Sequence, residues 1–359
     1  MGFEIDFLPV GDAGKSGDAI AIRIGNLYSA NRSDYAVIVV DGGSKVSGQA
    51  LVNHLNAHYA TDGHIDLVIM THPDGDHASG LTVILNQMTV GHLAMHLPWE
   101  YGDILADNVT DGRLTPQSIS KSIADDLDHA KAVYDIAISK GVTISEPFQG
   151  ISYFGGVIKI LGPSDLHYES MLPHFRSTPD TTLSPLLTMF RRSAQEAERL
   201  VTETMDIFTE TLTDEVGNWS AENCSSVITL FQIGSHSILL TADADAIALE
   251  EAINYADNQG IDLSNLFILQ VPHHGSRHNV GPIILNRLGS QFAQISAAVE
   301  GTPKHPSKQV TNALKRRNAK AYATQGSVIR YAHNAPERFG WGPAQEIPFY
   351  NDVEQFDEN

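Results

Sequence analysis

The sequence predicts an α/β protein, a four-layer αββα sandwich in which two β-sheets pack face to face between outer layers of helices. Two observations support this prediction. Short apolar runs alternate with longer amphipathic segments in both halves of the chain, on either side of a polar stretch at 165–220. Several apolar runs also end directly in Asp, His and Gly residues, a pattern typical of strands whose ends carry a functional site.

The first half predicts these elements in order. Strands are expected at 3–8, 18–24, 35–40, 67–70 and 93–97, with a hairpin at 151–161. Helices are expected at 47–60, 81–88 and 115–140, and Pro116 lies near the start of the last of these, where proline is tolerated.

The second half repeats the pattern. Strands are expected at 227–232, 237–241, 266–271 and 292–297, with a last strand pair formed by 321–324 and 328–331. Helices are expected at 246–259 and 307–317. Residues 165–220 are read as a largely helical insertion, especially over 185–211, that serves either as a packing decoration or as a lid. We therefore expect one catalytic domain over 1–340 and a C-terminal tail over 341–359.

Composition sets further limits. The chain has 359 residues, of which 42% are hydrophobic, so a large core can form. Its single cysteine, Cys224, excludes a disulfide framework and suits a reducing compartment. No stretch approaches about 20 uninterrupted apolar residues and no leader pattern is present, so we expect a cytoplasmic protein without membrane contact.

The formal net charge of −20 opposes non-specific binding of long duplex DNA. Residues 304–320 differ, because they contain six basic residues and no acidic ones. Two interpretations stay open for this stretch, a solvated helix face or a local patch for an anionic substrate.

One loop carries the strongest chemical signal. The strand at 67–70 runs into His72, Asp74, Asp76 and His77, four side chains that can ligate a metal. A bound divalent ion lowers the pKa of its water to about 7, which is what metal hydrolases require. The alternative is a polar loop whose aspartates cap the next helix. The spacing and the preceding strand favour a metal-dependent hydrolase.

The loop His72-Pro73-Asp74-Gly75-Asp76-His77 resembles the His-x-His-x-Asp-His signature of the metallo-β-lactamase superfamily, with Asp74 at the second His position. This version is similar to the C-terminal domain of ComEC-type DNA-uptake competence proteins and their stand-alone relatives. Two later segments fit the same resemblance. They are 239–243, which reads Leu-Leu-Thr-Ala-Asp, and 270–276, which reads Gln-Val-Pro-His-His-Gly-Ser.

The resemblance implies two divalent ions, Zn²⁺ or Mn²⁺, and leaves open whether the first site is complete. Asp243 would bridge them, although this residue and Asp245 both suit the cap of the next helix. The first ion would take His72 and Asp74, and the second would take Asp76, His77 and His273. It stays open whether His273 or the neighbouring His274 is the ligand. Replacing imidazole by carboxylate favours harder ions such as Mn²⁺. A further histidine for the first site cannot be placed; the candidates by residue type are His92, His96, His129, His167, His174 and His236.

Other residues are expected near the site by the same resemblance. Asp41, in Asp41-Gly42-Gly43 after a strand, would accept a hydrogen bond from a metal-binding histidine. Asn223 opens an Asn-x-x-Ser-x-Val stretch typical of competence-type relatives. Ser276 and Lys304 are expected either to support the site or to contact substrate. Two interpretations stay open for His305: it would steady a phosphate or donate a proton, or it would belong to a capped surface helix.

The resemblance implies a phosphodiesterase or nuclease in which a metal-bound hydroxide attacks a phosphodiester or other small anionic substrate. Asp76 or Asp243 would orient the hydroxide. His274 and His305 would also be catalytic residues. The alternatives are hydrolysis of a small ester, lactone or amide, and a metal-binding partner or sensor subunit with little turnover. Association with a partner protein or with further copies stays open.

Overall fold

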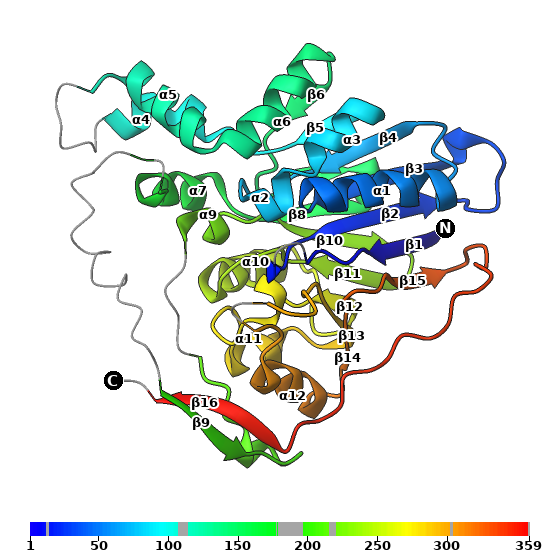
Figure 1. The fold of residues 1–359 in the computed structure, drawn as a ribbon, viewed down its shortest axis with the longest axis vertical. Coiled ribbons are helices and arrows are strands. Elements are labelled where there is room, and N and C mark those ends of the chain that lie inside the picture. Colours follow the sequence, from blue (N-terminus) through cyan, green and yellow to red (C-terminus); the bar gives the residue numbers. More distant parts are fainter. Residues whose placement is uncertain are drawn as a thin grey trace.

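The computed structural model describes residues 1–11, 14–106, 114–176, 178, 197–214, 220–301 and 304–357. Two seven-stranded sheets pack face to face, and helices cover the outer face of each sheet (Figure 1). The four-layer arrangement predicted from the sequence is therefore confirmed. Among the described residues, no helix is long and apolar enough to cross a membrane.

The first sheet has the strand order β15-β1-β2-β3-β4-β5-β6. Its strands are β15 (Ile329–His333), β1 (Gly2–Phe7), β2 (Ala19–Gly25), β3 (Tyr35–Gly42), β4 (His64–Ile69), β5 (Thr89–Ala94) and β6 (Thr143–Ser145). The pairs from β15 to β3 are antiparallel, and those from β3 to β6 are parallel.

The second sheet has the order β14-β13-β12-β11-β10-β8-β7. Its strands are β14 (Lys320–Ala323), β13 (Ser290–Ile295), β12 (Leu266–Gln270), β11 (His236–Leu240), β10 (Ile228–Ile233), β8 (Ile158–Gly162) and β7 (Ser152–Tyr153). Strands β11 to β14 run parallel. Because β3 and β4 in one sheet and β11 and β12 in the other are parallel neighbours, their carboxyl ends form shared edges that can carry a site.

Three apolar clusters explain the layers. The central cluster lies between the sheets and includes Phe3, Ile5 and Phe231, all fully buried. Alternation along β1 sends Phe3 and Ile5 inward and leaves Glu4 and Asp6 on the opposite face. Arginines cover that face, because Arg338 pairs with Asp6 at 2.8 Å and with Glu4 at 2.9 Å.

Helices bury an apolar stripe against each sheet. The first sheet carries α1 (Lys45–His58), α3 (Leu81–Gln87), α5 (Pro116–Asp126) and α6 (Asp128–Ser139), and the second carries α10 (Ala246–Asn258), α11 (Pro282–Arg287) and α12 (Lys308–Arg316). The shorter helices are η2 (Arg32–Asp34), α2 (Gly75–Ala78), η3 (Pro98–Tyr101), α4 (Gly102–Ala106), η4 (Phe154–Gly156), α7 (Asp165–Met171), η5 (Leu172–His174), η6 (Ile207–Thr209), α9 (Ala221–Cys224) and η7 (His273–Gly275).

Two predictions of secondary structure from the sequence are wrong. The segments at 321–324 and 328–331 do not pair with each other; β14 joins the edge of one sheet and β15 the edge of the other. The 165–220 segment is not largely helical where it is described, because Ala197–Thr202 forms β9 and pairs antiparallel with β16 (Asp352–Asp357). The C-terminal segment is therefore partly a strand. Residues 179–196, and with them much of the predicted lid, lie outside the described residues.

Acidic side chains neutralise much of the basic stretch at 304–320. Arg316 pairs with Glu203 at 2.9 Å, and Arg317 with Glu210 at 2.8 Å. Lys308 pairs with Glu354 at 2.6 Å, and Lys315 contacts Glu346. These four cations anchor the segments around β9 and β16 to α12, so they do not form an open patch for an anionic polymer.

Candidate metal centre

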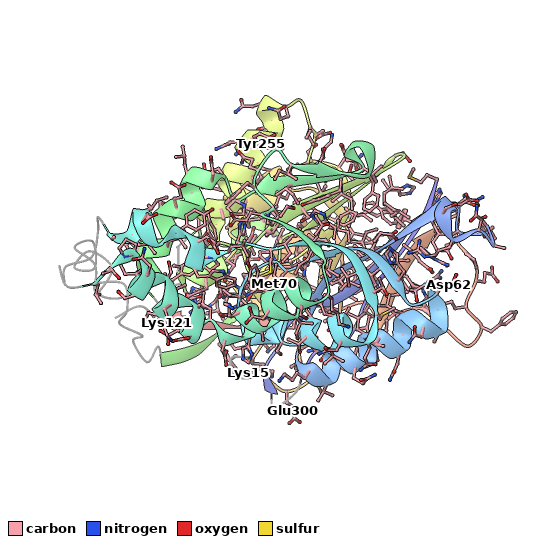
Figure 2. All side chains as sticks on the ribbon, turned by 90° about the horizontal axis from the view of Figure 1, so that it is seen from above. Lys15, Asp62, Met70, Lys121, Tyr255 and Glu300 are labelled. Atoms are coloured by element: carbon pink, nitrogen blue, oxygen red, sulfur yellow. The ribbon has the colours of Figure 1, made fainter. Side chains whose placement is uncertain are left out.

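The candidate centre forms where four parallel strands of the two sheets end. Asp41 lies near the end of β3, and the loop with His72 to His77 follows β4. Asp243 follows β11, and His273 and His274 follow β12. Met70, at the end of β4, is 2% exposed and lies inside the molecule, whereas Lys15 lies at its surface (Figure 2). The loop therefore projects from a packed strand, which fixes its position.

Glycine permits the close packing around this loop. A Cβ atom on Gly80 would collide with the carbonyl oxygen of Gly42, in the turn that follows Asp41. A Cβ atom on Gly17 would likewise collide with the carbonyl oxygen of Asp76. Any side chain at Gly17 or Gly80 would push the loop away from its neighbours.

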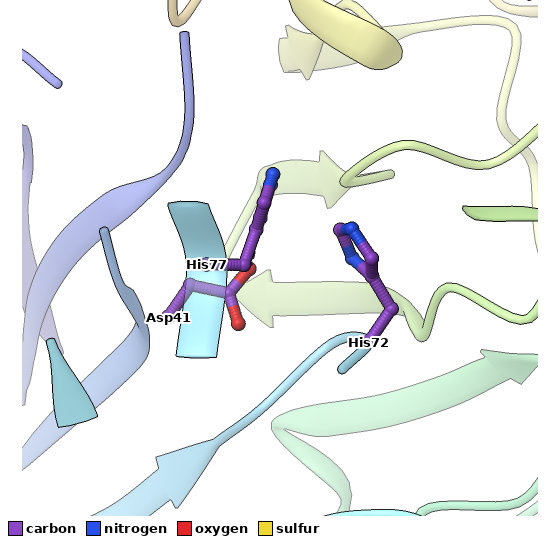
Figure 3. Close-up of side chains that lie close together, drawn as sticks. All are labelled: Asp41, His72 and His77. Atoms are coloured by element: carbon purple, nitrogen blue, oxygen red, sulfur yellow. Dashed lines mark hydrogen bonds and ion pairs between the residues drawn. The ribbon is translucent and has the colours of Figure 1, made fainter. Parts of the chain in front are cut away.

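Asp41 orients the first part of the loop. Its carboxylate accepts hydrogen bonds from the Thr71 backbone N–H at 2.8 Å and from the Thr71 hydroxyl at 2.6 Å. It also accepts one from His77 Nδ1 at 2.8 Å, so the Nε2 atom of His77 points away from Asp41 (Figure 3). Asp41 is fully buried with φ of 56°, a left-handed conformation that aspartate tolerates better than most residues.

His72 is held in a similar way. Its Nδ1 atom lies 3.0 Å from the Thr71 hydroxyl and 3.3 Å from the Ser226 hydroxyl. The rings of His72 and His77 lie side by side, with centroids 4.1 Å apart. The Nε2 atoms of both rings are buried without a hydrogen-bond partner. A buried donor or acceptor without a partner is costly, so these two atoms need an explanation.

Asp243 supplies that explanation, because imidazoles surround its carboxylate. Oδ1 lies 3.6 Å from Nε2 of His77 and 3.6 Å from Nε2 of His274. Oδ2 lies 3.9 Å from Nε2 of His72 and 3.7 Å from Nε2 of His273. The four histidines thus divide into two pairs, one on each carboxylate oxygen.

These separations are too long for hydrogen bonds and suit ligands of a shared cation. Two donors bound at about 2.1 Å in a tetrahedral arrangement are about 3.4 Å apart. Asp243 Oδ1 is also buried without a hydrogen-bond partner. The donor set therefore fits a divalent ion beside the Asp243 carboxylate.

Electrostatics favour a cation at the centre. Burial opposes ionisation of Asp243, but the four histidines outweigh it and hold the pKa of this carboxyl below its usual 3.8. Burial likewise disfavours the charged form of His77, yet Asp243 and Asp41 raise the pKa of this imidazole well above 6.5. Burial lowers the pKa of His274 to about 3. The carboxylates thus attract positive charge into a buried volume.

The loop after β12 presents both histidines at once. His273 and His274 have φ of 46° and 57°, and Gly275 has φ of 81°. This left-handed run aims the two consecutive rings at opposite oxygens of Asp243, at the expense of backbone strain. Asn279 supports the arrangement, since its Oδ1 lies 2.9 Å from Nδ1 of His273 and its Nδ2 donates to the Asp243 backbone carbonyl at 3.2 Å.

Three groups of potential ligands occur among the described residues: Asp41, His72 and His77; Asp76, His77 and His274; and Asp18, Asp243 and His274. In the first group the Asp41 carboxylate is already bonded to Thr71 and His77, which indicates support rather than metal binding. The other two groups share His274. They add Asp76 and the buried Asp18 to the side of the centre that holds Oδ1 of Asp243.

Asp18 was not singled out as a site residue from the sequence. It is 1% exposed, and burial together with the nearby Asp41 and Asp243 carboxylates raises its pKa to about 7. Its position after Gly17, in a segment that resembles Gly-Asp-Ala of the superfamily, was the available signal. Ser226, Asn279 and Arg176 were also missed, because nothing local in the sequence marks them.

Other predicted site residues are placed as follows. Asn223 lies at the centre, with its Nδ2 donating to Asp243 Oδ2 at 3.4 Å. His305 lies beside the histidine pair, 5.9 Å from His273 between ring centroids. Burial and nearby His273 lower the pKa of His305 to about 4, so the ring is neutral at pH 7. Asp245 is the N-cap of α10 and accepts from the Ala248 N–H, which leaves Asp243 for the centre.

Two predicted residues take part in other contacts, and a third is exposed. Asp74 belongs to none of the three ligand groups of the described chain and contacts Arg176 instead. Ser276 accepts from the His278 backbone N–H at 3.3 Å, and Lys304 is exposed. Of the histidines considered for a further ligand, His129 lies against Gly75 of the loop.

Residues 30–131 match the family model described as Metallo-beta-lactamase superfamily. This part of the chain is a metallo-beta-lactamase superfamily domain. The matched residues include the whole His72–His77 loop and Asp41, so the resemblance read from the motif is confirmed. Proteins of this superfamily are in general metal-dependent hydrolases, and the histidine and aspartate clusters agree with divalent metal binding.

Among curated proteins, the chain is similar to ComE operon protein 3 from Bacillus subtilis (strain 168), with 28% identity over 134 residues. The match covers 37% of this chain and 17% of that protein, so less than a fifth of the relative is represented. The similarity is weak and agrees with the competence-type resemblance of the loop.

The chain is also similar to solved structures. The metallo-beta-lactamase fold protein YhfI from Bacillus subtilis is 10% identical, with a TM-score of 0.43 and coverage of 92% of this chain and 99% of that chain. Zn²⁺-bound PqqB from Methylobacterium extorquens is 10% identical, with a TM-score of 0.44 and coverage of 91% and 99%. A long form RNase Z from yeast is 11% identical, with a TM-score of 0.43 and coverage of 91% and 41%. Identities this low carry no information on substrate.

Proposed function

We propose that this protein is a metal-dependent phosphodiesterase that acts on small or single-stranded phosphodiesters. The observation that carries the proposal is the Asp243 carboxylate, with two histidine Nε2 atoms facing each of its oxygens. His72 and His273 would hold one divalent ion, and His77, His274 and Asp76 the other. Zn²⁺ and Mn²⁺ both suit a donor set that mixes imidazole and carboxylate.

Bound at this centre, divalent ions would lower the pKa of water and stabilise negative charge that develops on a phosphoryl group. The residues of the chain would fix the geometry. Asp41 and Asn279 hold the Nδ1 sides of His77 and His273, so that each Nε2 faces inward. Such supporting bonds are worth about 10- to 100-fold in metal affinity.

Charge favours a small phosphodiester over long DNA. The net charge of −20 repels polyanions, and the described acidic side chains pair with four cations of the 304–320 stretch. The cleft beside the loop, of about 630 Å³, contains Lys15, His129 and Arg176. A volume of this size suits a nucleotide or a short strand end.

The test is hydrolysis of bis(p-nitrophenyl) phosphate and of end-labelled single-stranded DNA by chelator-treated protein reloaded with Mn²⁺ or Zn²⁺. Cleavage is expected to need metal and to fall at least about 10³-fold in the Asp76→Ala, His77→Ala variant. His64→Ala, a partly exposed histidine at the other end of β4, is the matched control and should retain activity. Stoichiometric metal binding without cleavage of either substrate would overturn the phosphodiester proposal and favour an ester substrate or a binding role.

A further inference from the structure

The aspartate that replaces histidine in the loop has an unexpected partner. Asp74 immediately precedes α2, yet its side chain makes no capping hydrogen bond to that helix. Its Oδ1 atom contacts Nη2 of Arg176, which follows η5 about a hundred residues later. The carboxylate that the motif assigns to the first ion is therefore already paired with a cation.

A second carboxylate fixes Arg176 from the other side. Glu222 is fully buried, and its Oε1 atom accepts from the Arg176 backbone N–H at 2.7 Å and from Nε at 3.1 Å. A buried carboxylate needs a counter-charge, and the Arg176 guanidinium supplies it. Burial opposes the charged form of Arg176, but Asp74 and Glu222 outweigh it and raise its pKa. Arg176 thus keeps one orientation between the two acids.

The centre can hold its ions without Asp74. On the Oδ2 side of Asp243, His72 and His273 supply two imidazole nitrogens. His273 thereby takes the place of the further histidine that the sequence could not locate. The three ligand groups of the described residues contain neither Asp74 nor His273. The two residues differ in their contacts, because Nε2 of His273 lies 3.7 Å from the Asp243 carboxylate whereas Asp74 contacts Arg176. An arginine and a divalent cation would also repel each other if both bound this one carboxylate.

Arg176 retains free donors at the cleft. The side chain is 59% exposed and lines the cleft of about 630 Å³ together with Asp76 of the metal loop. Its Nε and Nη2 atoms bind the two acids, which leaves Nη1 with two N–H groups. Guanidinium groups bind phosphate oxygens through such paired donors. Asp126 and Asp128 line the same cleft, so a site for anions there depends on Arg176 and Lys15.

We propose that Asp74 is a positioning residue rather than a metal ligand, and that with Glu222 it holds Arg176 where the guanidinium binds the phosphate group of the substrate. The substrate class rests on the function proposed above. The part that concerns metal binding does not, so the two can fail separately.

The first experiment counts ions. Chelator-treated wild type and the variants Asp74→Asn and Asp243→Asn are titrated with Mn²⁺ and analysed for bound metal per chain. Asp74→Asn is expected to bind as many ions as wild type, within a few-fold in affinity, whereas Asp243→Asn loses metal. Loss of one ion in Asp74→Asn, with circular dichroism unchanged, would overturn the proposal by making Asp74 a ligand. This readout needs no activity.

The second experiment separates binding from turnover. Arg176→Gln is expected to raise KM for bis(p-nitrophenyl) phosphate about tenfold or more, as expected for a lost charge-assisted hydrogen bond, with a smaller change in kcat and an unchanged metal count. Arg176→Lys keeps the charge without the fork and should recover part of the loss. Arg287→Gln, which removes a half-buried arginine paired with Asp257, is the matched control.

A phosphate titration makes the outcome independent of turnover. Inorganic phosphate is expected to bind metal-loaded wild type at least about tenfold more tightly than Arg176→Gln by calorimetry. Equal phosphate affinity in the two proteins would overturn the role of Arg176. If wild type binds phosphate through Arg176 but cleaves no phosphodiester, the function proposed above fails while this inference stands.

Discussion

Replacing Asp41 by asparagine tests whether the supporting shell sets metal affinity. The buried carboxylate accepts three hydrogen bonds, two from Thr71 and one from His77 Nδ1. Asparagine keeps the size and tolerates the φ of 56° at this position. It has only one acceptor oxygen, so its amide N–H₂ must face at least one of these donors. The backbone should therefore survive while the hydrogen-bond pattern fails.

The size of the effect follows from those bonds. Hydrogen bonds to a charged acceptor are worth about 1.5–3 kcal/mol, and Asp41→Asn should cost about that much in the free energy of unfolding without metal. If the amide faces His77, this imidazole loses the partner that keeps its proton on Nδ1, and Nε2 becomes a poorer ligand. We expect metal affinity to fall about 10- to 100-fold, the usual loss for such supporting residues.

The assay is competition with a chromophoric chelator for Zn²⁺, beside urea unfolding of the metal-free protein. Asp66→Asn is the matched control, because Asp66 also lies on the first sheet and accepts from the Val37 N–H at 2.7 Å, near the opposite end of β4. It should lose stability without losing metal affinity. Metal binding by Asp41→Asn as tight as that of wild type would refute the reasoning.

The remaining predictions concern the histidine pair and the outer charge network. His273→Ala and His274→Ala should each lower the number of bound ions by one, measured by metal analysis, and an unchanged ion count in either variant would contradict the division into two pairs. Burial raises the pKa of Asp6, but His54 and Arg338 outweigh it and lower this pKa below 3.8. The resulting stabilisation is complete above pH 3.8 and is lost as the pH falls through the lower folded-state value. Asp6→Asn should thus cost about 3–5 kcal/mol at pH 7 by urea unfolding, with the difference from wild type shrinking in acid; a difference that does not change with pH would contradict this assignment.

Local patterns sufficed for much of the fold and of the centre. The strand-to-loop transition at 67–77 and the Leu-Leu-Thr-Ala-Asp segment at 239–243 each placed metal-competent side chains at the end of a buried strand. Parallel neighbours then bring those ends together, as β3 with β4 and β11 with β12 do here. Alternation along β1 likewise separated the buried Phe3 from the outward-facing Glu4.

Long-range pairing could not be read in the same way. The last two predicted strands look like a hairpin locally, yet β14 and β15 join different sheets, because each completes an edge formed far away in the sequence. Strand β9 lies in a polar segment and pairs with β16 about 150 residues later. Nothing in either segment alone specifies that partner.

The electrostatic partners were also beyond local reading. Arg176 lies in a stretch with no recognisable motif, and only the folded chain brings it to Asp74 and Glu222. The basic run at 304–320 looked like a patch because its acidic partners, among them Glu203 and Glu354, are distant in sequence. The directions in which His273 and His274 point depend on left-handed backbone angles that their residue types do not predict.

Electron paramagnetic resonance of the protein reloaded with Mn²⁺ tests the central claim most directly, because it reports both the number of ions and whether they share a ligand. The arrangement of histidine pairs on the two oxygens of Asp243 predicts two ions per chain with an exchange-coupled spectrum. In Asp243→Asn the coupling should disappear. A single ion, or two ions with the spectrum of isolated Mn²⁺ in wild type, would contradict the claim that Asp243 joins two metal sites.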